Sequence, residues 1–301
     1  MKTAICTISS EGHLFKTKAL FHSLSSLTDA AFHCLITDSD AEQELGDRIG
    51  QVQLSELNSA TAQTIKGKYL EDKLRWACKP LLLLYLLEKE YDSVIYVDND
   101  IYFYGSPDFL FEMLVDHSVL LTPHFYNADP TEKQHWLEAN FRIGLYNAGF
   151  IAASQSGKDA LKWWGNCCAY NVKQSSWRGL FDDQRYLDML PILSDDVHVL
   201  KHRGCNVASW NVDQNPRSLN QQGNIILGEK WPLIFIHFNG FTMRAIGKGQ
   251  DEMLRPHLNA YFANLKEYNP NFTTNIITKY GLSDVLNYLR YLWWMLIRKM
   301  D

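Results

Sequence analysis

Short apolar runs alternate with helical patterns along most of the chain. Strand-like runs occupy residues 3–8, 33–38, 51–57, 93–100, 118–124, 146–154 and 233–241. Between them, helical periodicity covers residues 13–27, 70–90 and 158–170. Pro80 either kinks the second of these patterns or marks the start of a shorter helix. This alternation is typical of βαβ units, so the sequence predicts an α/β fold whose mostly parallel central sheet is flanked by helices.

The most informative segment is residues 91–107, YDSVIYVDNDIYFYGSP, in which an apolar strand ends at Asp98 and Asp100. Residues i and i+2 of a strand point to the same face of the sheet. The two carboxylates would therefore lie close together and repel each other, unless a cation stands between them. Ligands of open α/β sheets bind at the carboxyl ends of strands. The pair therefore indicates a Mn²⁺ or Mg²⁺ site, since both ions prefer oxygen ligands. The alternative is that one aspartate caps a turn and the other is a solvated surface group.

Composition narrows the class of protein. The chain has 301 residues, of which 46% are hydrophobic and 21% charged, enough for one large core. A formal net charge of −5 argues against a nucleic-acid partner. The six cysteines show no CxxC spacing, so we expect reduced thiols and neither a zinc ribbon nor a disulfide framework. The first residues lack the apolar core of a signal peptide, and no apolar run approaches the roughly 20 residues that span a bilayer, so we expect a cytoplasmic protein.

The C-terminal segment differs from the rest of the chain. Residues 281–299 combine an apolar helical stripe with tryptophans and basic residues. The pattern fits a helix lying on the inner surface of the cytoplasmic membrane, and equally a terminal helix docked on the core or on a second subunit of a homodimer. We therefore divide the chain into a main domain, residues 1–270, and a C-terminal amphipathic helix, residues 271–301.

Four segments together resemble a known family. They are SVIYVDNDIYFYGSP, LYNAGFIAAS, FDDQRYLD and FIHFNG, in this order over residues 3–245. The set resembles nucleotide-sugar glycosyltransferases of the GT-A fold, most closely the retaining family-eight group of glycogenin- and galactosyltransferase-like enzymes. Where that family continues to Lys-Pro-Trp, this chain runs FTMRAIGKGQ, with Arg244 and Lys248 as nearby cations. The departure suggests a bacterial branch with its own acceptor, in surface-polysaccharide biosynthesis.

The resemblance implies roles for several residues. Asp98, Asp100 and His237 would be the metal ligands. His237 also ends a strand, and Gly240 after it lets backbone approach a ligand. Gln184 would lie near the anomeric carbon and Asp183 on the sugar hydroxyls. A helix N-cap followed by a first-turn polar residue would explain these last two equally well.

The remaining candidates concern the donor and the leaving group. Lys79 is either a cation that offsets charge on the departing phosphate or an ordinary lysine at a helix start. A polar loop after the first strand would contact the nucleoside, and Asn147 and Asp98 would face the donor sugar, although Asn147 could be structural. Trp210 could stack on an acceptor sugar or belong to the core. The loop residues are Thr7, Ser9 and Ser10.

The function expected from these features is a metal-dependent glycosyltransferase that takes a sugar from a nucleoside diphosphate sugar, UDP-sugars being favoured. It would pass the sugar, with retention, to a saccharide or lipid-linked saccharide. Two alternatives stay open. One is an inactive module that binds a nucleotide sugar or glycan. The other is a sugar nucleotidyltransferase, which would need a glycine-rich phosphate loop, whereas SSEGHLFK contains only Gly12.

Overall fold

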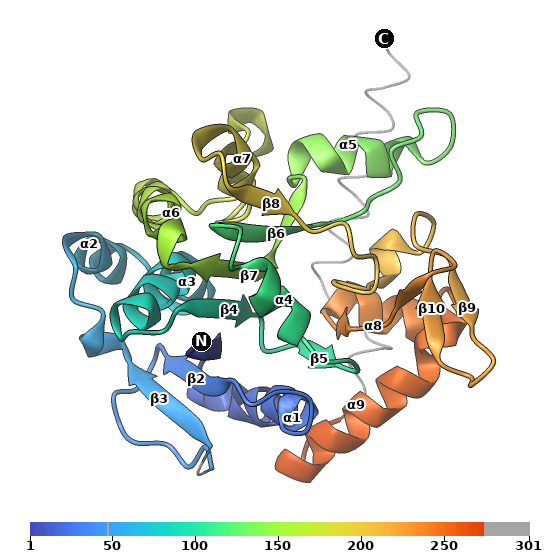
Figure 1. Ribbon diagram of the computed structural model, residues 1–301, viewed down its shortest axis with the longest axis horizontal. Coiled ribbons are helices and arrows are strands. Elements are labelled where there is room, and N and C mark those ends of the chain that lie inside the picture. Colours follow the sequence, from blue (N-terminus) through green and yellow to red (C-terminus); the bar gives the residue numbers. More distant parts are fainter. Residues whose placement is uncertain (47, 274–301) are drawn as a thin grey trace.

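A seven-stranded mixed sheet organises the part of the chain that the structure, a computed structural model, describes: residues 1–46 and 48–273 (Figure 1). Its strands lie in the order β3-β2-β1-β4-β7-β6-β8. β7 runs antiparallel to both its neighbours, and the other pairs are parallel. The prediction of a mostly parallel sheet is therefore confirmed. The strands are β1 (Thr3–Ser9), β2 (Ala31–Ile36), β3 (Ile49–Gln53), β4 (Ser93–Val97), β6 (Val119–Pro123), β7 (Tyr146–Ser154) and β8 (Val197–Val199).

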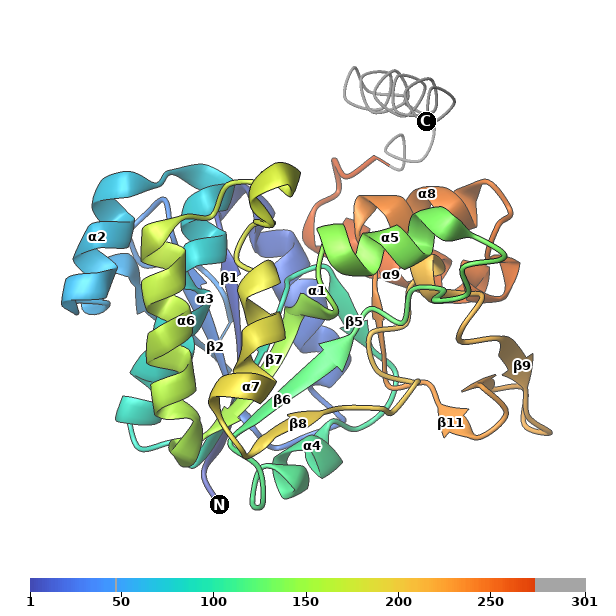
Figure 2. The same cartoon turned by 90° about the horizontal axis from the view of Figure 1, so that it is seen from above.

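Helices cover both faces of the sheet (Figure 2). α3 and α6 pack against each other and, with α2, share one apolar cluster with the sheet. α1 and α4 share a second cluster on the opposite face. Because both faces are covered, β4 and β7 are buried at every residue, in keeping with their mostly apolar sequences. The helices are α1 (Leu14–Leu24), α2 (Ala60–Lys68), α3 (Glu71–Glu88), α4 (Asp108–Met113) and α6 (Lys158–Tyr170).

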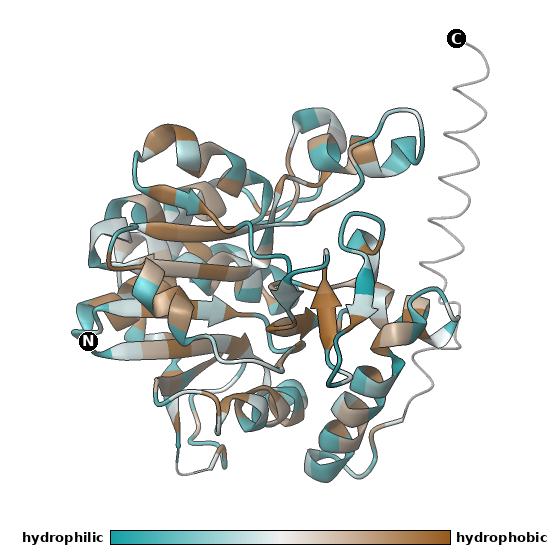
Figure 3. Ribbon diagram, turned by 45° about the vertical axis from the view of Figure 1, so that its right-hand side comes forward, coloured by the Kyte–Doolittle hydropathy of each residue, from teal (hydrophilic) through white to brown (hydrophobic). Residues whose placement is uncertain are grey.

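A second group of elements joins the sheet beyond the end of β4. β5 (Ile101–Phe103) pairs antiparallel with β12 (Phe235–His237), with His237 opposite Ile101. α8 (Gly240–Gly247) and α9 (Arg255–Tyr268) bury their apolar residues in a third cluster around β12. In Figure 3 the apolar colour follows the strands, while the outer faces of the helices are more polar. The strand that follows the two aspartates, β5, is thus hydrogen-bonded to the strand that ends at His237, β12.

Most predicted elements occur where the sequence placed them, and β7 and α6 match to the residue. Pro80 lies inside α3, which begins at Glu71, so Lys79 is in the middle of a helix and the expected helix start there is wrong. The sequence missed several helices and a small three-stranded sheet, whose strands of two or three residues are too short to show periodicity. The missed elements include β8 of the main sheet, α2, α5 (Gln134–Arg142), α8, α9, β9 (Arg217–Leu219), β10 (Ile225–Leu227) and β11 (Trp231–Pro232).

Three further expectations concern the chain as a whole. The cysteines are free, and five of the six are buried. Within the described ranges, we find no helix with the length and apolar character needed to cross a membrane. The expected amphipathic pattern of residues 281–299 lies outside the described residues.

The segment that leads into β12 depends on a buried glycine. The carbonyl oxygen of Gly204 accepts hydrogen bonds from Ile234 N at 2.9 Å and Phe235 N at 3.2 Å. A Cβ at this position would stand 1.7 Å from the carbonyl oxygen of Pro232. We expect Gly204→Ala to lower the free energy of unfolding by about 3 kcal/mol, the cost of severe overpacking.

Urea denaturation measures this change. Gly67→Ala is the matched control, because no neighbouring atom lies within 4 Å of its Cβ position in α2. Alanine should stabilise that helix by roughly 0.5–1 kcal/mol. Equal stability of Gly204→Ala and the unmodified chain would contradict the packing described here.

Candidate active site

The two aspartates follow the last residue of β4. Asp98 N donates to Gly149 O at 2.8 Å, which extends the pairing of β4 with β7 by one residue. Ile101 N then donates to Asp98 O at 3.0 Å, closing a tight turn that leads into β5. Asp100 O accepts from Phe238 N at 2.8 Å, so this turn is also tied to the end of β12. Both carboxylates are therefore fixed at the carboxyl end of the sheet.

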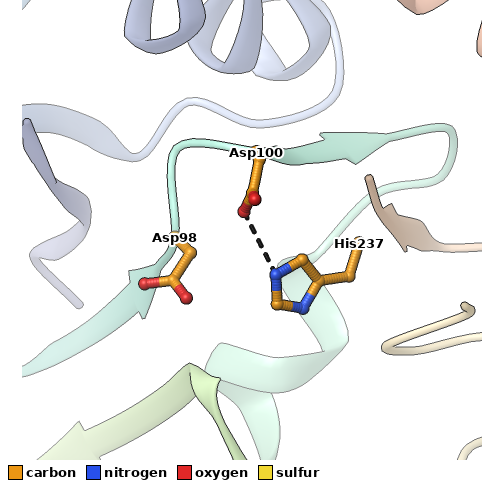
Figure 4. Close-up of side chains that lie close together, drawn as sticks. All are labelled: Asp98, Asp100 and His237. Atoms are coloured by element: carbon orange, nitrogen blue, oxygen red, sulfur yellow. Dashed lines mark ion pairs between the residues drawn. The ribbon is translucent and has the colours of Figure 1, made fainter. Parts of the chain in front are cut away.

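His237 completes a three-residue cluster with these carboxylates (Figure 4). Its Nε2 lies 3.1 Å from Asp100 Oδ1. One ligand atom from each of Asp98, Asp100 and His237 lies within 4.8 Å of the others. The structure thus brings together the three residues that the sequence named as metal ligands.

Charge couples His237 to Asp100. Burial by itself would raise the pKa of Asp100, but the neighbouring His237 outweighs burial and lowers the pKa of the carboxyl to about 2. Conversely, burial would lower the pKa of His237, and Asp100, with Asp98 behind it, raises that pKa instead. The carboxylates therefore create a negative potential that favours a cation at this position.

Gly149 keeps open a space beside two of the ligands, Asp98 and His237. A Cβ there would stand 2.5 Å from Asn147 Oδ1, 2.6 Å from His237 Cε1 and 3.0 Å from Asp98 Oδ2. Asn147 is buried and its Oδ1 accepts from Gly149 N at 2.7 Å, which fixes this part of β7. Two carboxylates, one imidazole and a space without a side chain fit a Mn²⁺ or Mg²⁺ ion.

Lys79 lies buried behind Asp98 and joins three acceptors. Its Nζ is 3.2 Å from Asp98 Oδ1, 3.3 Å from Asp183 Oδ2 and 3.0 Å from Ala148 O. Burial would lower the pKa of Lys79, but Asp183 and Asp98 outweigh burial and raise it. The ammonium group thus donates one hydrogen bond to a carbonyl oxygen and forms ion pairs with two carboxylates. The geometry therefore favours a role in holding the two carboxylates.

Asp183 and Gln184 lie on the other side of this ammonium group. Asp183 is 2% exposed, and burial raises its pKa to about 6 although Lys79 opposes the change. Gln184 Oε1 accepts from Ala148 N at 3.1 Å, and its Nε2 donates to Ile143 O at 3.3 Å. The following 3₁₀ helix has no side-chain cap hydrogen bond, so the structure does not show the capping alternative for these residues.

A cleft of about 350 Å³ opens beside the aspartates. Its lining includes three basic side chains that the sequence analysis missed: His13 and Lys16 near the start of α1, and Arg75 on α3. Arg75 pairs with Asp72 on its own helix, whereas Lys16 has no ion pair with any described residue. The i, i+3 spacing of His13 and Lys16, and the shared helical face of Arg75 and Lys79, were signals that could have pointed to this cleft.

The predicted nucleoside loop lies next to this cleft. Thr7 and Ser9 are fully buried in β1, and Ser9 Oγ accepts from Asn99 Nδ2 at 3.3 Å. Ser10 Oγ and His13 Nδ1 are hydrogen-bonded at 2.8 Å. The residue of β1 that lines the cleft is Ile8. These hydroxyls therefore support the cleft wall, and their contact with a nucleoside stays a prediction.

Two other candidates lie beyond His237. Gly240 is the first residue of α8, whose N-cap Asn239 accepts from Thr242 N at 2.9 Å. Trp210 is 5% exposed, donates through Nε1 to His124 O at 3.0 Å, and meets the His237 ring edge-on at 5.5 Å between centroids. Of the two alternatives for Trp210, the structure shows the core.

Two proteins of Bacillus subtilis are similar to this chain in sequence. No family model matches the chain. It is 31% identical over 261 residues to YfnF of Bacillus subtilis, a match that covers 82% of this chain and 84% of YfnF. The chain belongs to the family of YfnF. YfnD of the same organism is 29% identical over 249 residues, covering 79% of this chain and 77% of YfnD; both relatives are named as uncharacterised.

Solved structures support the fold of this YfnF relative. The galactosyltransferase LgtC superimposes with a TM-score of 0.56 at 13% identity, over 90% of this chain and 98% of LgtC. The glycosyltransferase GlyE of Streptococcus pneumoniae gives 0.50 at 15% identity, over 89% of this chain and 63% of GlyE. The prediction of the GT-A glycosyltransferase fold is confirmed.

A prediction follows from the space above Gly149. In Gly149→Ala, the new methyl group must displace Asn147, His237 or Asp98, so we expect Mn²⁺ to bind at least about tenfold more weakly, the usual effect of disturbing the groups that orient metal ligands. Electron paramagnetic resonance of unbound Mn²⁺ measures this affinity. Gly67→Ala in α2 is the control and should bind Mn²⁺ as the unmodified chain does. Unchanged affinity in Gly149→Ala would argue against a metal ion at this cluster.

Proposed function

We propose that this member of the YfnF family is a metal-dependent glycosyltransferase that takes a sugar from a nucleoside diphosphate sugar. The observation that carries the proposal is the cluster of Asp98, Asp100 and His237 at the carboxyl end of β4, beside a polar cleft in a GT-A fold that Lys16 and Arg75 also line. LgtC, whose fold this chain shares, has been solved in complex with donor and acceptor sugar analogs. By analogy we assign the cleft to the donor and favour UDP-sugars.

A divalent cation held by Asp98, Asp100 and His237 would act as a Lewis acid toward the diphosphate leaving group. The residues of the chain supply the remaining interactions. Asp183 and Asn147 are proposed to accept hydrogen bonds from sugar hydroxyls. Gln184 lies beside β7, where its Oε1 accepts from Ala148 N. Its proposed place near the anomeric carbon rests on the resemblance of the motif. Retention of configuration is proposed from the resemblance of these motifs to the retaining family.

The second cation for the phosphates is proposed to be Lys16 rather than Lys79. Lys79 is buried and held inside the protein by a hydrogen bond to Ala148 O and by ion pairs with Asp98 and Asp183. Lys16 lines the cleft with Asn99 and Asp100 and has no ion pair among the described residues. Arg75 faces the same cleft from α3. We propose that these side chains supply the positive charge that the lysine of the Lys-Pro-Trp segment would supply in the family-eight glycosyltransferases. This chain has α8 in place of that segment.

The acceptor is proposed to be a saccharide or lipid-linked saccharide. Support for the lipid comes from the sequence of residues 281–299 alone, in which an apolar stripe is combined with basic residues. This assignment would place the protein in the synthesis of bacterial surface polysaccharide at the inner face of the membrane.

The proposed function is tested by calorimetry and donor hydrolysis across UDP-, GDP-, dTDP- and CMP-sugars, with Mn²⁺ and with EDTA. We expect one nucleotide class to bind and turn over with Mn²⁺ only. Asp100→Ala and His237→Ala should each weaken metal-dependent donor binding by roughly 100-fold, because each removes a metal ligand.

The control is the melting temperature of each variant, which should show that both are folded. Binding without hydrolysis or transfer would favour the inactive module. No binding of any donor by the folded, unmodified chain would overturn the proposal.

Lys16 allows a separate prediction about the phosphates. A hydrogen bond to a charged group contributes about 1.5–3 kcal/mol, so Lys16→Ala should weaken donor binding by roughly 10- to 100-fold. The loss should shrink at high salt, because the interaction is screened. Lys18→Ala is the matched control, since Lys18 lies on the same helix but lines a different depression with Phe21 and His22. Equal donor affinities of the two variants would refute the role of Lys16.

A further inference from the structure

The two carboxylate oxygens of Asp98 have different surroundings. Oδ1 accepts a hydrogen bond from the Tyr96 hydroxyl at 2.7 Å and lies 3.2 Å from Lys79 Nζ. Oδ2 lies above Gly149, 3.0 Å from the point where a Cβ of that residue would stand, and His237 Cε1 is 2.6 Å from the same point. One oxygen is therefore engaged by the protein, and the other faces the candidate metal ligands.

Tyr96 is well placed to impose this difference. It precedes Asp98 by two residues, so both side chains leave β4 on the same face. Tyr96 is 2% exposed, packed in the cluster between the sheet and α3, and cannot turn away to solvent. Lys79 approaches the same oxygen from α3 while it also holds Asp183 and Ala148 O. The carboxylate of Asp98 is thus held at Oδ1 from two elements.

We propose that Tyr96 is a positioning residue that holds Asp98 by Oδ1 and reserves Oδ2 for the divalent cation. The inference rests on the proposed function, since it concerns the same metal site. It also predicts which divalent cations the site prefers. Asp98 contributes a single oxygen, which suits six-coordinate Mg²⁺ or Mn²⁺ and disfavours Ca²⁺, which takes more oxygens and often a bidentate carboxylate.

Tyr96→Phe is the decisive variant, because it removes one oxygen atom and leaves the packing of the ring. We expect Mn²⁺, titrated alone and with UDP and followed by electron paramagnetic resonance, to bind about tenfold more weakly. Ca²⁺ competition supplies the second readout. The preference for Mn²⁺ over Ca²⁺ should fall several-fold, because Asp98 is then freer to offer both oxygens. A merely structural role of Tyr96 would not change this ratio.

Tyr104→Phe is the matched control. Its hydroxyl also donates to a protein oxygen, His257 O at 3.0 Å, but that oxygen belongs to α9, which supplies no residue to the cluster. Both variants should lose thermal stability to a similar extent, and only Tyr96→Phe should alter the metal affinity and the Ca²⁺ ratio. The unmodified chain gives a test that needs no variant: it should bind Mn²⁺ at least about tenfold more tightly than Ca²⁺.

The outcomes separate the two proposals. Unchanged Mn²⁺ affinity and Ca²⁺ ratio in Tyr96→Phe, in a protein that binds Mn²⁺, would overturn the inference and leave the proposed function standing. Equal losses in Tyr96→Phe and Tyr104→Phe, or a preference of the unmodified chain for Ca²⁺, would overturn it as well. Absence of Mn²⁺ binding to the unmodified chain, with and without UDP, would overturn the metal site itself and the inference with it.

Discussion

The buried ammonium group of Lys79 is the interaction on which the site depends. It joins α3 to Asp98 after β4, to Ala148 in β7 and to Asp183, all within 3.3 Å. Removing one partner of such a buried pair typically costs about 3–5 kcal/mol, because the other charge is left uncompensated. Three carboxylates, Asp98, Asp100 and Asp183, surround Lys79 and His237, and an imidazole that ligates a metal is neutral, so negative charge remains in excess. This excess is what a divalent cation would neutralise.

The site is assembled from two parts of the fold whose residues are far apart in the sequence. The sheet supplies Asp98 at the end of β4 and the Asn147–Gly149 segment of β7 beside it. The pairing of β5 with β12 supplies the other part and brings His237 to Asp100. Because β5 follows directly after Asp100, the backbone that positions the carboxylate also fixes the register of the histidine. The apolar cluster around α8 and α9 then holds β12 in place.

The GT-A fold shows how the strands and helices are arranged, whereas the reaction depends on the residues of the site. The likeness to LgtC at 13% identity establishes the arrangement of strands and helices, and the identity to YfnF establishes the family. Neither determines the reaction, because one fold supports many activities and function resides in the site. Here the basic residues of the cleft come from α1 and α3, whereas residues 240–247 after the histidine motif form α8.

The sequence by itself determined the features that depend on local pattern. An apolar run was enough to place Asp98 at the end of β4, but Asp100 lies in the turn after it, so the expected i, i+2 pairing on one strand face is wrong. A mostly apolar run was enough to define β7. The four motifs, taken in order, named His237 as the third ligand. Only the tertiary structure decided that Lys79 is a buried bridge inside α3, that Lys16 and Arg75 line the cleft, and that Trp210 belongs to the core. The short strands β9–β11 also emerged only there. These features rest on ion pairs, backbone pairing and burial between residues far apart in the chain, and such contacts leave no periodic signal in the sequence.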